Sequence, residues 1–294
     1  MSETTCAIVV TYNRKELLRE CLQALMTQTQ QVDEILVVNN ASNDGTTAML
    51  RKEFPEVRVL NLWQNIGGAG GFHEGMKRVY GEEYDWIWLL DDDSIPEPTA
   101  LEELFLALPI LQTLDASPML LASKAIWVDG DLHPINRPWP LIQKRLLFTK
   151  ALERGYMLIR AASFVSVLLN RDAIIKYGLP YSDFFTWADD WEYTGRVLLR
   201  ESGYLVPKSV VVHRTQRYEP NTMFTGPRLY YGVRNRIWLL KSSSFTWKEK
   251  MYLAWRTVAG VAMYLRCSST SERLRVLRGY TAASLAGLLT SPKN

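Results

Sequence analysis

Trp86-Ile-Trp-Leu-Leu-Asp-Asp-Asp93 decides the fold, because a wholly apolar run ends abruptly in three adjacent carboxylates. Five large apolar side chains in a row predict a strand buried on both faces, as in a parallel sheet covered by helices. The carboxylates then lie where a core strand reaches solvent, and their mutual repulsion is costly unless a cation neutralises them. Alternate residues at a strand end point the same way, so Asp91 and Asp93 can share Mg²⁺ or Mn²⁺. The alternative is an acidic helix cap, although a cap needs only one carboxylate.

Three further strand-like runs precede this stretch, and each ends in a polar cluster before a helical pattern begins. They are Cys6–Val10, 35–38 and 57–62. This alternation predicts an α/β fold with a mostly parallel sheet wound by right-handed crossovers. Later segments predict a helix over 96–114, strands over 163–169 and 210–213, and helices from about residue 226. Ligands of such sheets bind at the carboxyl ends of the strands, where the polar clusters lie.

Asn65-Ile-Gly-Gly-Ala-Gly-Gly-Phe72 places four glycines within five positions. We expect a loop between the third strand and a helix, in which glycine lets the backbone approach a phosphate or sugar oxygen closely. A dinucleotide site is disfavoured because His73 stands where its fingerprint needs glycine. The segment also follows the third strand rather than the first, so a nicotinamide oxidoreductase is excluded.

A second acidic cluster, Asp189-Asp-Trp-Glu192, follows the aromatic stretch 184–187. Carboxylates beside aromatic walls can gain proton affinity, which suits a general base. They also suit a helix N-terminus, which is the structural alternative. His213 ends an apolar run, and a lone histidine there becomes a candidate ligand only if both acidic clusters lie beside it.

The order of these motifs along residues 5 to 240 resembles the inverting glycosyltransferases of family 2, which have the Rossmann-like GT-A fold of nucleotide-diphospho-sugar transferases. The motifs are Thr11-Tyr-Asn-Arg14, Val37-Val-Asn-Asn-Ala-Ser-Asn-Asp-Gly-Thr46, the glycine-rich segment, the three aspartates, Trp187-Ala-Asp-Asp-Trp-Glu192 and His213. The glycine-rich and second acidic motifs look most like the galactofuranosyltransferase branch, and rhamnosyltransferases are close in pattern.

The resemblance implies a role for each matching residue. Nucleotide-sugar binding falls to Thr11, Tyr12, Asn13, Arg14, Asn39, Asn40, Asn65, Gly67, Gly68, Gly70, Gly71, Asp91 and Asp92. The metal ligands would be Asp91, Asp93 and His213, and the acceptor pocket would contain Trp187, Asp189 and Glu192. Asp190 would be the catalytic base. Asn39 departs from the family, because many members have aspartate there.

The implied activity is transfer of galactofuranose from UDP-galactofuranose to a hydroxyl of a polyprenyl-diphosphate-linked cell-surface glycan such as O-antigen, capsule or galactan. A divalent cation, Mn²⁺ or Mg²⁺, is the expected cofactor. One alternative is a rhamnosyltransferase that uses dTDP-rhamnose. Another, of a different class, is a non-catalytic accessory protein that binds glycan or lipid, although a binding module has no need for so many unpaired carboxylates.

The charge of the chain is unevenly distributed. Its 294 residues include 34 basic and 31 acidic ones, a net charge of +3, which does not indicate nucleic-acid binding. From residue 221 onward, twelve basic residues stand against two acidic ones, a local charge of +10 that leaves −7 for the first 220 residues. A basic segment with interleaved tryptophan and tyrosine suits an anionic membrane surface, whereas the alternatives are a solvated helical face, helix packing or a homo-oligomer interface.

We therefore expect a catalytic domain over 1–225 and a helical, basic and aromatic extension over 226–294. Three cysteines without a CxxC pair fit a reducing compartment, and the first residues lack the pattern of a signal peptide. The apolar run at 251–265 is broken by Arg256 and is shorter than the ~20 residues that span a bilayer. The expected location is the cytoplasm, with peripheral association at the inner face of the plasma membrane.

Overall fold

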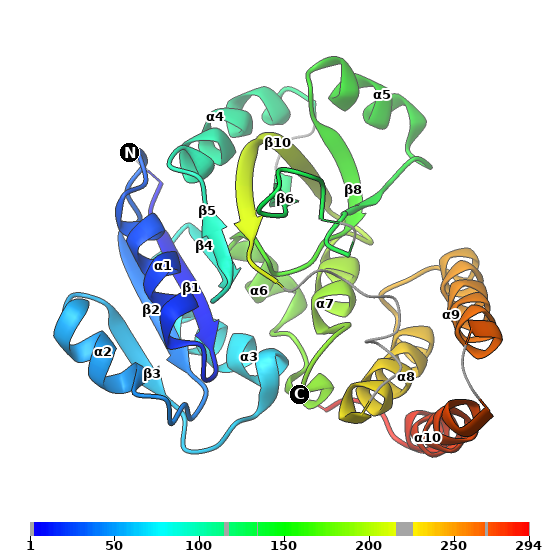
Figure 1. Cartoon of the computed structure of the whole chain (residues 1–294). Coiled ribbons are helices and arrows are strands. Elements are labelled where there is room, and N and C mark those ends of the chain that lie inside the picture. The colour runs from blue at the N-terminus through cyan, green and yellow to red at the C-terminus, as the bar shows by residue number, and fades with distance from the viewer. Residues whose placement is uncertain (1–2, 115–117, 134, 216–225, 268–269, 294) are drawn as a thin grey trace.

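The computed structural model describes residues 3–114, 118–133, 135–215, 226–267 and 270–293 (Figure 1). The strands are β1 (Thr5–Thr11), β2 (Glu34–Asn39), β3 (Arg58–Asn61), β4 (Trp86–Asp91), β5 (Ser94–Pro96), β6 (Pro118–Ile126), β7 (Trp139–Pro140), β8 (Met157–Ala161), β9 (Val167–Asn170) and β10 (Ser202–His213). The helices are α1 (Lys15–Met26), α2 (Thr46–Glu53), α3 (Gly67–Val79), α4 (Ala100–Gln112), α5 (Arg145–Glu153), α6 (Asp172–Tyr177), the 3₁₀ turn η1 (Ser182–Phe184), α7 (Asp189–Val197), α8 (Gly226–Lys241), α9 (Trp247–Cys267) and α10 (Thr270–Leu289).

The strands form one sheet in the order β3-β2-β1-β4-β9-β6-β10-β8-β7, and β5 pairs with β10. Strands β3, β2, β1 and β4 are parallel, as the strand–helix alternation predicts. Beyond β4 the sheet is mixed, because β9 runs antiparallel to both β4 and β6. No pattern in the sequence indicates this change of strand direction. Only the parallel pairing of β3, β2, β1 and β4 is therefore predictable from the sequence.

The sheet is buried on both faces, which explains the near-continuous apolar strands. Along β1, Ala7 and Val9 face the core under α1, α2, α4 and α5, whereas Cys6 and Ile8 face the core under α3, α6 and α7. Alternate residues therefore serve opposite layers. This three-layer α/β packing fixes the strand ends, and with them the polar clusters that follow β1, β2 and β4.

Local boundaries correct several sequence expectations. The glycine-rich segment is the start of helix α3 and not a loop. Gly71 packs on β1 so closely that a Cβ there would lie 2.4 Å from Val10 Cγ1. Glycine favours this helix through packing, in spite of its poor intrinsic helix propensity. The helix predicted to begin at residue 96 begins at Ala100, because Pro96 belongs to β5, and the strand predicted from residue 163 begins at Val167.

Helices α8, α9 and α10 gather on one side of the molecule, next to α7 and away from α1 and α2 (Figure 1). Residues 216–225, which contain the proposed boundary between catalytic domain and extension, lie outside the described residues. A buried ion pair between Arg160 of β8 and Glu249 of α9, 2.8 Å apart, connects the two parts. None of the helices within the described residues is long and apolar enough to cross a membrane.

Candidate functional site

The carboxyl ends of β1, β2 and β4 bring the predicted polar clusters to one edge of the sheet. In the parallel ladder, Thr11 lies beside Asn39, and Val10 lies beside Asp91. Strand β10 approaches from the other side through the antiparallel pair His213 and Ser94. Residues separated by more than 200 positions therefore meet at the end of β4.

Asp91, Asp93 and His213 each offer a ligand atom, and these atoms all lie within 4.8 Å of one another. His213 Nε2 is 3.1 Å from Asp93 Oδ1, while its Nδ1 is 2.9 Å from Asn136 Oδ1. Asn136 in turn donates from Nδ2 to Ser163 Oγ at 2.9 Å, which turns its oxygen toward the histidine. A histidine held through Nδ1 can present Nε2 to a metal, and this support is characteristic of metal-ligating histidines. Two carboxylates and one imidazole are a donor set that fits Mn²⁺ or Mg²⁺.

Asp92 points away from this cluster, as the alternation along a strand end predicts. It is buried and accepts hydrogen bonds from Thr11 Oγ1 at 2.8 Å and from Arg14 Nη1 at 3.1 Å. Burial raises the pKa of Asp92 to about 6 against the opposing effect of Arg14. Arg14 Nη1 also lies 2.5 Å from Asp93 Oδ2 and remains half-exposed. Asp92 thus orients Arg14 at the mouth of the cluster.

The acidic cluster has strongly perturbed proton affinities. Burial, together with the neighbouring Asp93 and Asp92, raises the pKa of Asp91 well above its usual value. For Asp93, burial acts to raise the pKa, but the His213 hydrogen bond and the charges of His213 and Arg14 outweigh it and lower the pKa. Perturbed carboxylates of this kind concentrate at functional sites.

The amide side chains predicted to bind the nucleotide hold the loops that surround the site. Asn39 donates to Thr47 Oγ1 at 2.9 Å and to Asn61 Oδ1 at 2.8 Å. Asn40 donates to Gly67 O at 2.9 Å and accepts from Ile66 N, and Asn65 Oδ1 accepts from Gly67 N at 2.8 Å.

Asn13 has a φ of 53°, and its Oδ1 accepts from Asn43 N at 2.8 Å. Its backbone amide donates to Ser42 Oγ. Tyr12 is exposed at the rim. These bonds fix the walls of the site, while Tyr12 and Arg14 keep accessible surface.

The second acidic cluster occupies the first turn of α7, the helix N-terminus that the sequence offers as the structural alternative. Burial, followed by the Asp189 charge, raises the pKa of Asp190 well above its usual value, and Asp91 contributes to the same shift. Burial also raises the pKa of Asp189 to about 6. The Asp91 charge acts on the pKa of Asp190, so the two acidic clusters lie near one another.

Trp187, predicted to shape the acceptor pocket, is 38% exposed beside this turn. Glu192, predicted for the same pocket, is buried instead and engaged on both oxygens. It accepts from Ser244 Oγ at 2.6 Å and from Arg196 Nη2 at 2.9 Å. Glu192 therefore joins α7 to the segment before α9 and has no oxygen left for an acceptor.

The glycines have different surroundings. A Cβ on Gly67, whose φ is 76°, would lie 1.9 Å from Phe185 O, and one on Gly70 would lie 2.6 Å from Ile66. A Cβ on Gly68 would meet nothing within 4 Å, so among Gly67, Gly68, Gly70 and Gly71 this backbone alone has open space beside it.

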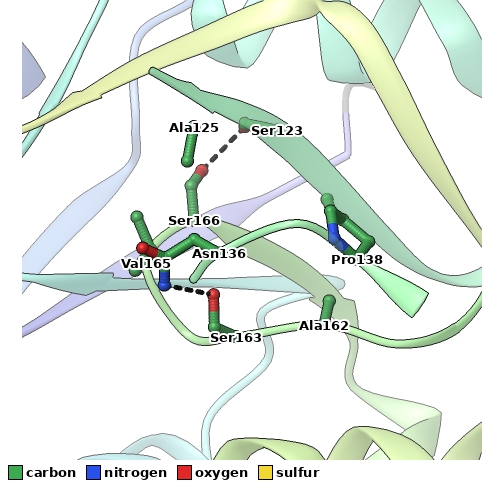
Figure 2. A pocket seen from close by; sticks show the side chains of 9 residues that line it. Ser123, Ala125, Asn136, Pro138, Ala162, Ser163, Val165 and Ser166 are labelled. Atoms are coloured by element: carbon green, nitrogen blue, oxygen red, sulfur yellow. Dashed lines mark hydrogen bonds between the residues drawn. The ribbon is translucent and has the colours of Figure 1, made fainter. Parts of the chain in front are cut away.

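Figure 2 shows a small cavity of about 10 Å³ beside Asn136. It is lined by Ala122, Ser123, Ala125, Asn136, Pro138, Ala162, Ser163, Val165 and Ser166. Its size suits about one water molecule. A larger open hollow, of about 480 Å³, lies at the opposite end of α7 among Lys176, Arg196 and Arg200. Neither hollow is lined by a residue of the two acidic clusters or by His213.

Two buried polar residues, His133 and Asn235, and the partly buried Asn136 are not among the residues that the sequence patterns single out. The His133 ring lies 4.7 Å from that of His213, and burial followed by the His213 charge lowers the pKa of His133 to about 4. Asn136 lies in the proline-rich stretch 134–140, and this composition could have singled it out; Pro134 itself lies outside the described residues. Asn235 of α8 contacts the loop before Asp189, and no local pattern indicates it.

A family model described as glycosyl transferase family 2 matches residues 6–172, more than half of the chain. The chain belongs to glycosyl transferase family 2. This family 2 chain is 29% identical over 204 residues to the galactofuranosyltransferase GlfT1 of Mycolicibacterium smegmatis, covering 67% of the chain and 66% of the relative. GlfT1 of Mycobacterium tuberculosis is 29% identical over 206 residues, again covering 67% and 66%. The match thus spans just under two thirds of the length of these curated relatives.

Solved structures with the same fold include Staphylococcus aureus TarS residues 1–349 in complex with UDP-GlcNAc, with a TM-score of 0.64 and 15% identity. That match covers 96% of the family 2 chain and 81% of the TarS chain. The mannosyltransferase PcManGT of Pyrobaculum calidifontis in complex with GDP-Man and Mn²⁺ has a TM-score of 0.58 at 15% identity, covering 98% and 85%. At this identity the likeness establishes the GT-A fold.

Proposed function

We propose that this family 2 transferase moves galactofuranose from UDP-galactofuranose to a hydroxyl of a polyprenyl-diphosphate-linked cell-surface glycan, with inversion at the anomeric carbon. The observation that carries the proposal is the cluster of Asp91, Asp93 and His213 at the carboxyl edge of the sheet, with a second acidic cluster near it. One cluster has the donor set of a divalent cation, and the other has a carboxylate of raised pKa. The galactofuranosyl donor is inferred from the likeness to GlfT1.

Asp91, Asp93 and His213 would hold the divalent cation, which supplies Lewis-acid stabilisation of the negative charge that grows on the leaving diphosphate. Arg14 can add to this effect, because its half-exposed guanidinium lies at the mouth of the same cluster. Thr11 and Asp92 orient that guanidinium. The nucleotide would then lie along the rim that Tyr12 and the Asn39 loop form.

Asp190 would remove the acceptor hydroxyl proton as the acceptor oxygen attacks the anomeric carbon from the face opposite the diphosphate. A raised pKa suits this role, because a base of ordinary carboxylate strength is a poor proton acceptor at neutral pH. One displacement inverts the anomer, and no covalent intermediate with the chain is required. Trp187, exposed beside Asp190, would contact the acceptor sugar.

Helix α9 offers a surface for a lipid-linked acceptor. Trp247, Met251 and Trp255 are 66%, 62% and 65% exposed and share one face by their spacing of four. Glu249, the single acidic residue of this helix, is turned inward onto Arg160, so basic side chains alone flank the apolar face. Apolar, aromatic and basic groups together suit the headgroup region of an anionic membrane. A homo-oligomer through the same face is the alternative, but it would bring like charges together.

The test is incubation of the purified protein with Mn²⁺, a lipid-linked acceptor and a panel of UDP- and dTDP-sugars. We expect transfer from UDP-galactofuranose and its loss in Asp190→Asn, with UDP binding retained. Transfer from dTDP-rhamnose instead would establish the rhamnosyltransferase alternative. Failure of every donor would remove the enzyme proposal and leave a glycan- or lipid-binding accessory protein. Full turnover in Asp190→Asn would remove the base assignment alone.

A further inference from the structure

Helix α8 of the C-terminal extension holds the loop that carries the residues before the proposed base. Asn235 is fully buried, and its Nδ2 lies 2.9, 2.7 and 2.8 Å from the carbonyl oxygens of Phe184, Thr186 and Trp187. One amide group therefore engages three of four consecutive peptide carbonyls. This arrangement defines the path of the main chain immediately before Asp189.

Arg234 fixes the orientation of that amide. Its Nε donates to Asn235 Oδ1 at 3.0 Å, which leaves Nδ2 facing the loop. Its Nη2 donates to the carbonyls of Asp183 at 2.7 Å and Phe184 at 3.1 Å. The guanidinium also lies 4.0 Å from the centre of the Trp238 ring. These contacts fix the orientation of the donor groups of α8 toward the loop.

The loop needs such support because its backbone is strained. Phe185, Trp187 and Ala188 have φ values of 64°, 65° and 71°, which side chains other than glycine rarely adopt. Residues in this region persist only where the surroundings impose the conformation. On the other side of the loop, Phe185 O accepts from Ala69 N at 3.2 Å and rests on Gly67. The loop is therefore wedged between α3 and α8.

We propose that Asn235 is a positioning residue of the transferase, which sets the orientation of Trp187 and Asp190 by fixing the three carbonyls before them. The inference rests on the proposed function, because it assigns Asp190 and Trp187 their roles. Asn235 itself would touch neither donor, metal nor acceptor. It makes the C-terminal extension part of the acceptor side of the active site.

The test compares Asn235→Ala and the isosteric Asn235→Asp with Leu229→Ala, a control on the same helix. Leu229 is buried in a cluster with Val276 and Ala283 of α10, and this cluster includes no residue of the loop. For both Asn235 variants we expect kcat with the preferred donor to fall about 10- to 100-fold, as for a misplaced reacting group. The KM for the donor and the Kd for UDP should stay within about threefold, because the nucleotide side is untouched. Leu229→Ala should retain kcat.

Hydrogen–deuterium exchange of residues 183–192 supplies a readout that does not depend on turnover. Exchange should accelerate in Asn235→Asp and not in Leu229→Ala. An unchanged kcat in Asn235→Asp, or an equal loss of kcat in Leu229→Ala, would overturn the positioning role. Absence of turnover in the wild-type protein would refute the proposed function instead. In that case, unchanged exchange of residues 183–192 in Asn235→Asp would separately show that Asn235 does not hold the loop.

Discussion

The buried pair Arg160–Glu249 offers the sharpest stability prediction. The two side chains are only 3% and 9% exposed. Arg160 donates to Glu249 at 2.8 Å, to Gly195 O at 2.6 Å, and to Ser244 O. Glu249 also accepts from Thr246 N at 2.7 Å, which closes the N-terminus of α9. One guanidinium thus joins β8, the base helix α7 and the extension.

Glu249→Gln keeps the shape of this arrangement, but it replaces one of the two accepting oxygens with a donor and leaves the buried Arg160 without a counter-charge. Breaking a buried pair in this way typically lowers the unfolding free energy by about 3–5 kcal/mol. A chain of this length has an unfolding entropy of about 0.6 kcal/mol/K at its midpoint. We therefore expect Tm to fall by about 5–8 °C. The loss should change little with added NaCl, because a buried pair is weakly screened.

The measurement is thermal unfolding followed by circular dichroism and tryptophan fluorescence, with Glu74→Gln as the control. Glu74 lies 3.7 Å from Lys77 in an exposed pair, so its loss should change stability by less than about 1 kcal/mol. In a double-mutant cycle, Arg160→Met should recover part of the Glu249→Gln loss by removing the unpaired charge. Strict additivity, or equal effects of Glu249→Gln and Glu74→Gln, would refute the reasoning.

Three further outcomes follow from the site. Gly71→Ala should lower the unfolding free energy by about 1–3 kcal/mol, because the added Cβ would overlap Val10 of β1. Gly68→Ala should leave the unfolding free energy unchanged, because a Cβ there would meet nothing within 4 Å. Denaturant unfolding of the two variants measures the difference. Asp93→Asn should abolish the Mn²⁺ dependence of UDP binding in calorimetry, and an unchanged Mn²⁺ effect would remove it from the ligand set. Burial raises the pKa of Asp190 above that of an ordinary carboxyl, so protonation should inactivate the base at a higher pH than usual. The acidic limb of kcat/KM should therefore lie above about pH 4, the range of an ordinary carboxyl, and a limb at about pH 4 contradicts this.

Much of the site is readable from the sequence because parallel strands end at one edge. The apolar run ending at Asp91 indicates both the buried strand and the placement of its carboxylates. Thr11 and Asn39 then follow, because their strands are neighbours in the same ladder. His213 is different: its proximity to Asp93 depends on the antiparallel pairing of β10 with β5, which no local pattern encodes. The resemblance to a family supplied that residue.

The remaining differences come from packing between distant segments. The glycine-rich helix violates local propensity, and only its close approach to β1 makes it favourable. Glu192 shares the motif of Asp190 but lies on the α7 face where Arg196 and Ser244 take up its oxygens. Asn235 carries no signature at all, since its role arises from a loop about fifty residues earlier.

The uneven distribution of charge along the chain corresponds to two different regions of the structure, the acidic cluster at the end of β4 and the basic C-terminal extension. Arg14 and His213 lie against the three aspartates at the end of β4, and Arg14 already divides its hydrogen bonds between two of them. Asp91 is left with a raised pKa, so a divalent cation can relieve a repulsion that the chain itself does not neutralise. Glu249 is withdrawn from the exposed face of α9 by Arg160, which leaves the basic residues of that helix without an acidic neighbour on it. Under the proposed function the two charged regions would serve different partners, a cation with its diphosphate on one side and an anionic surface on the other.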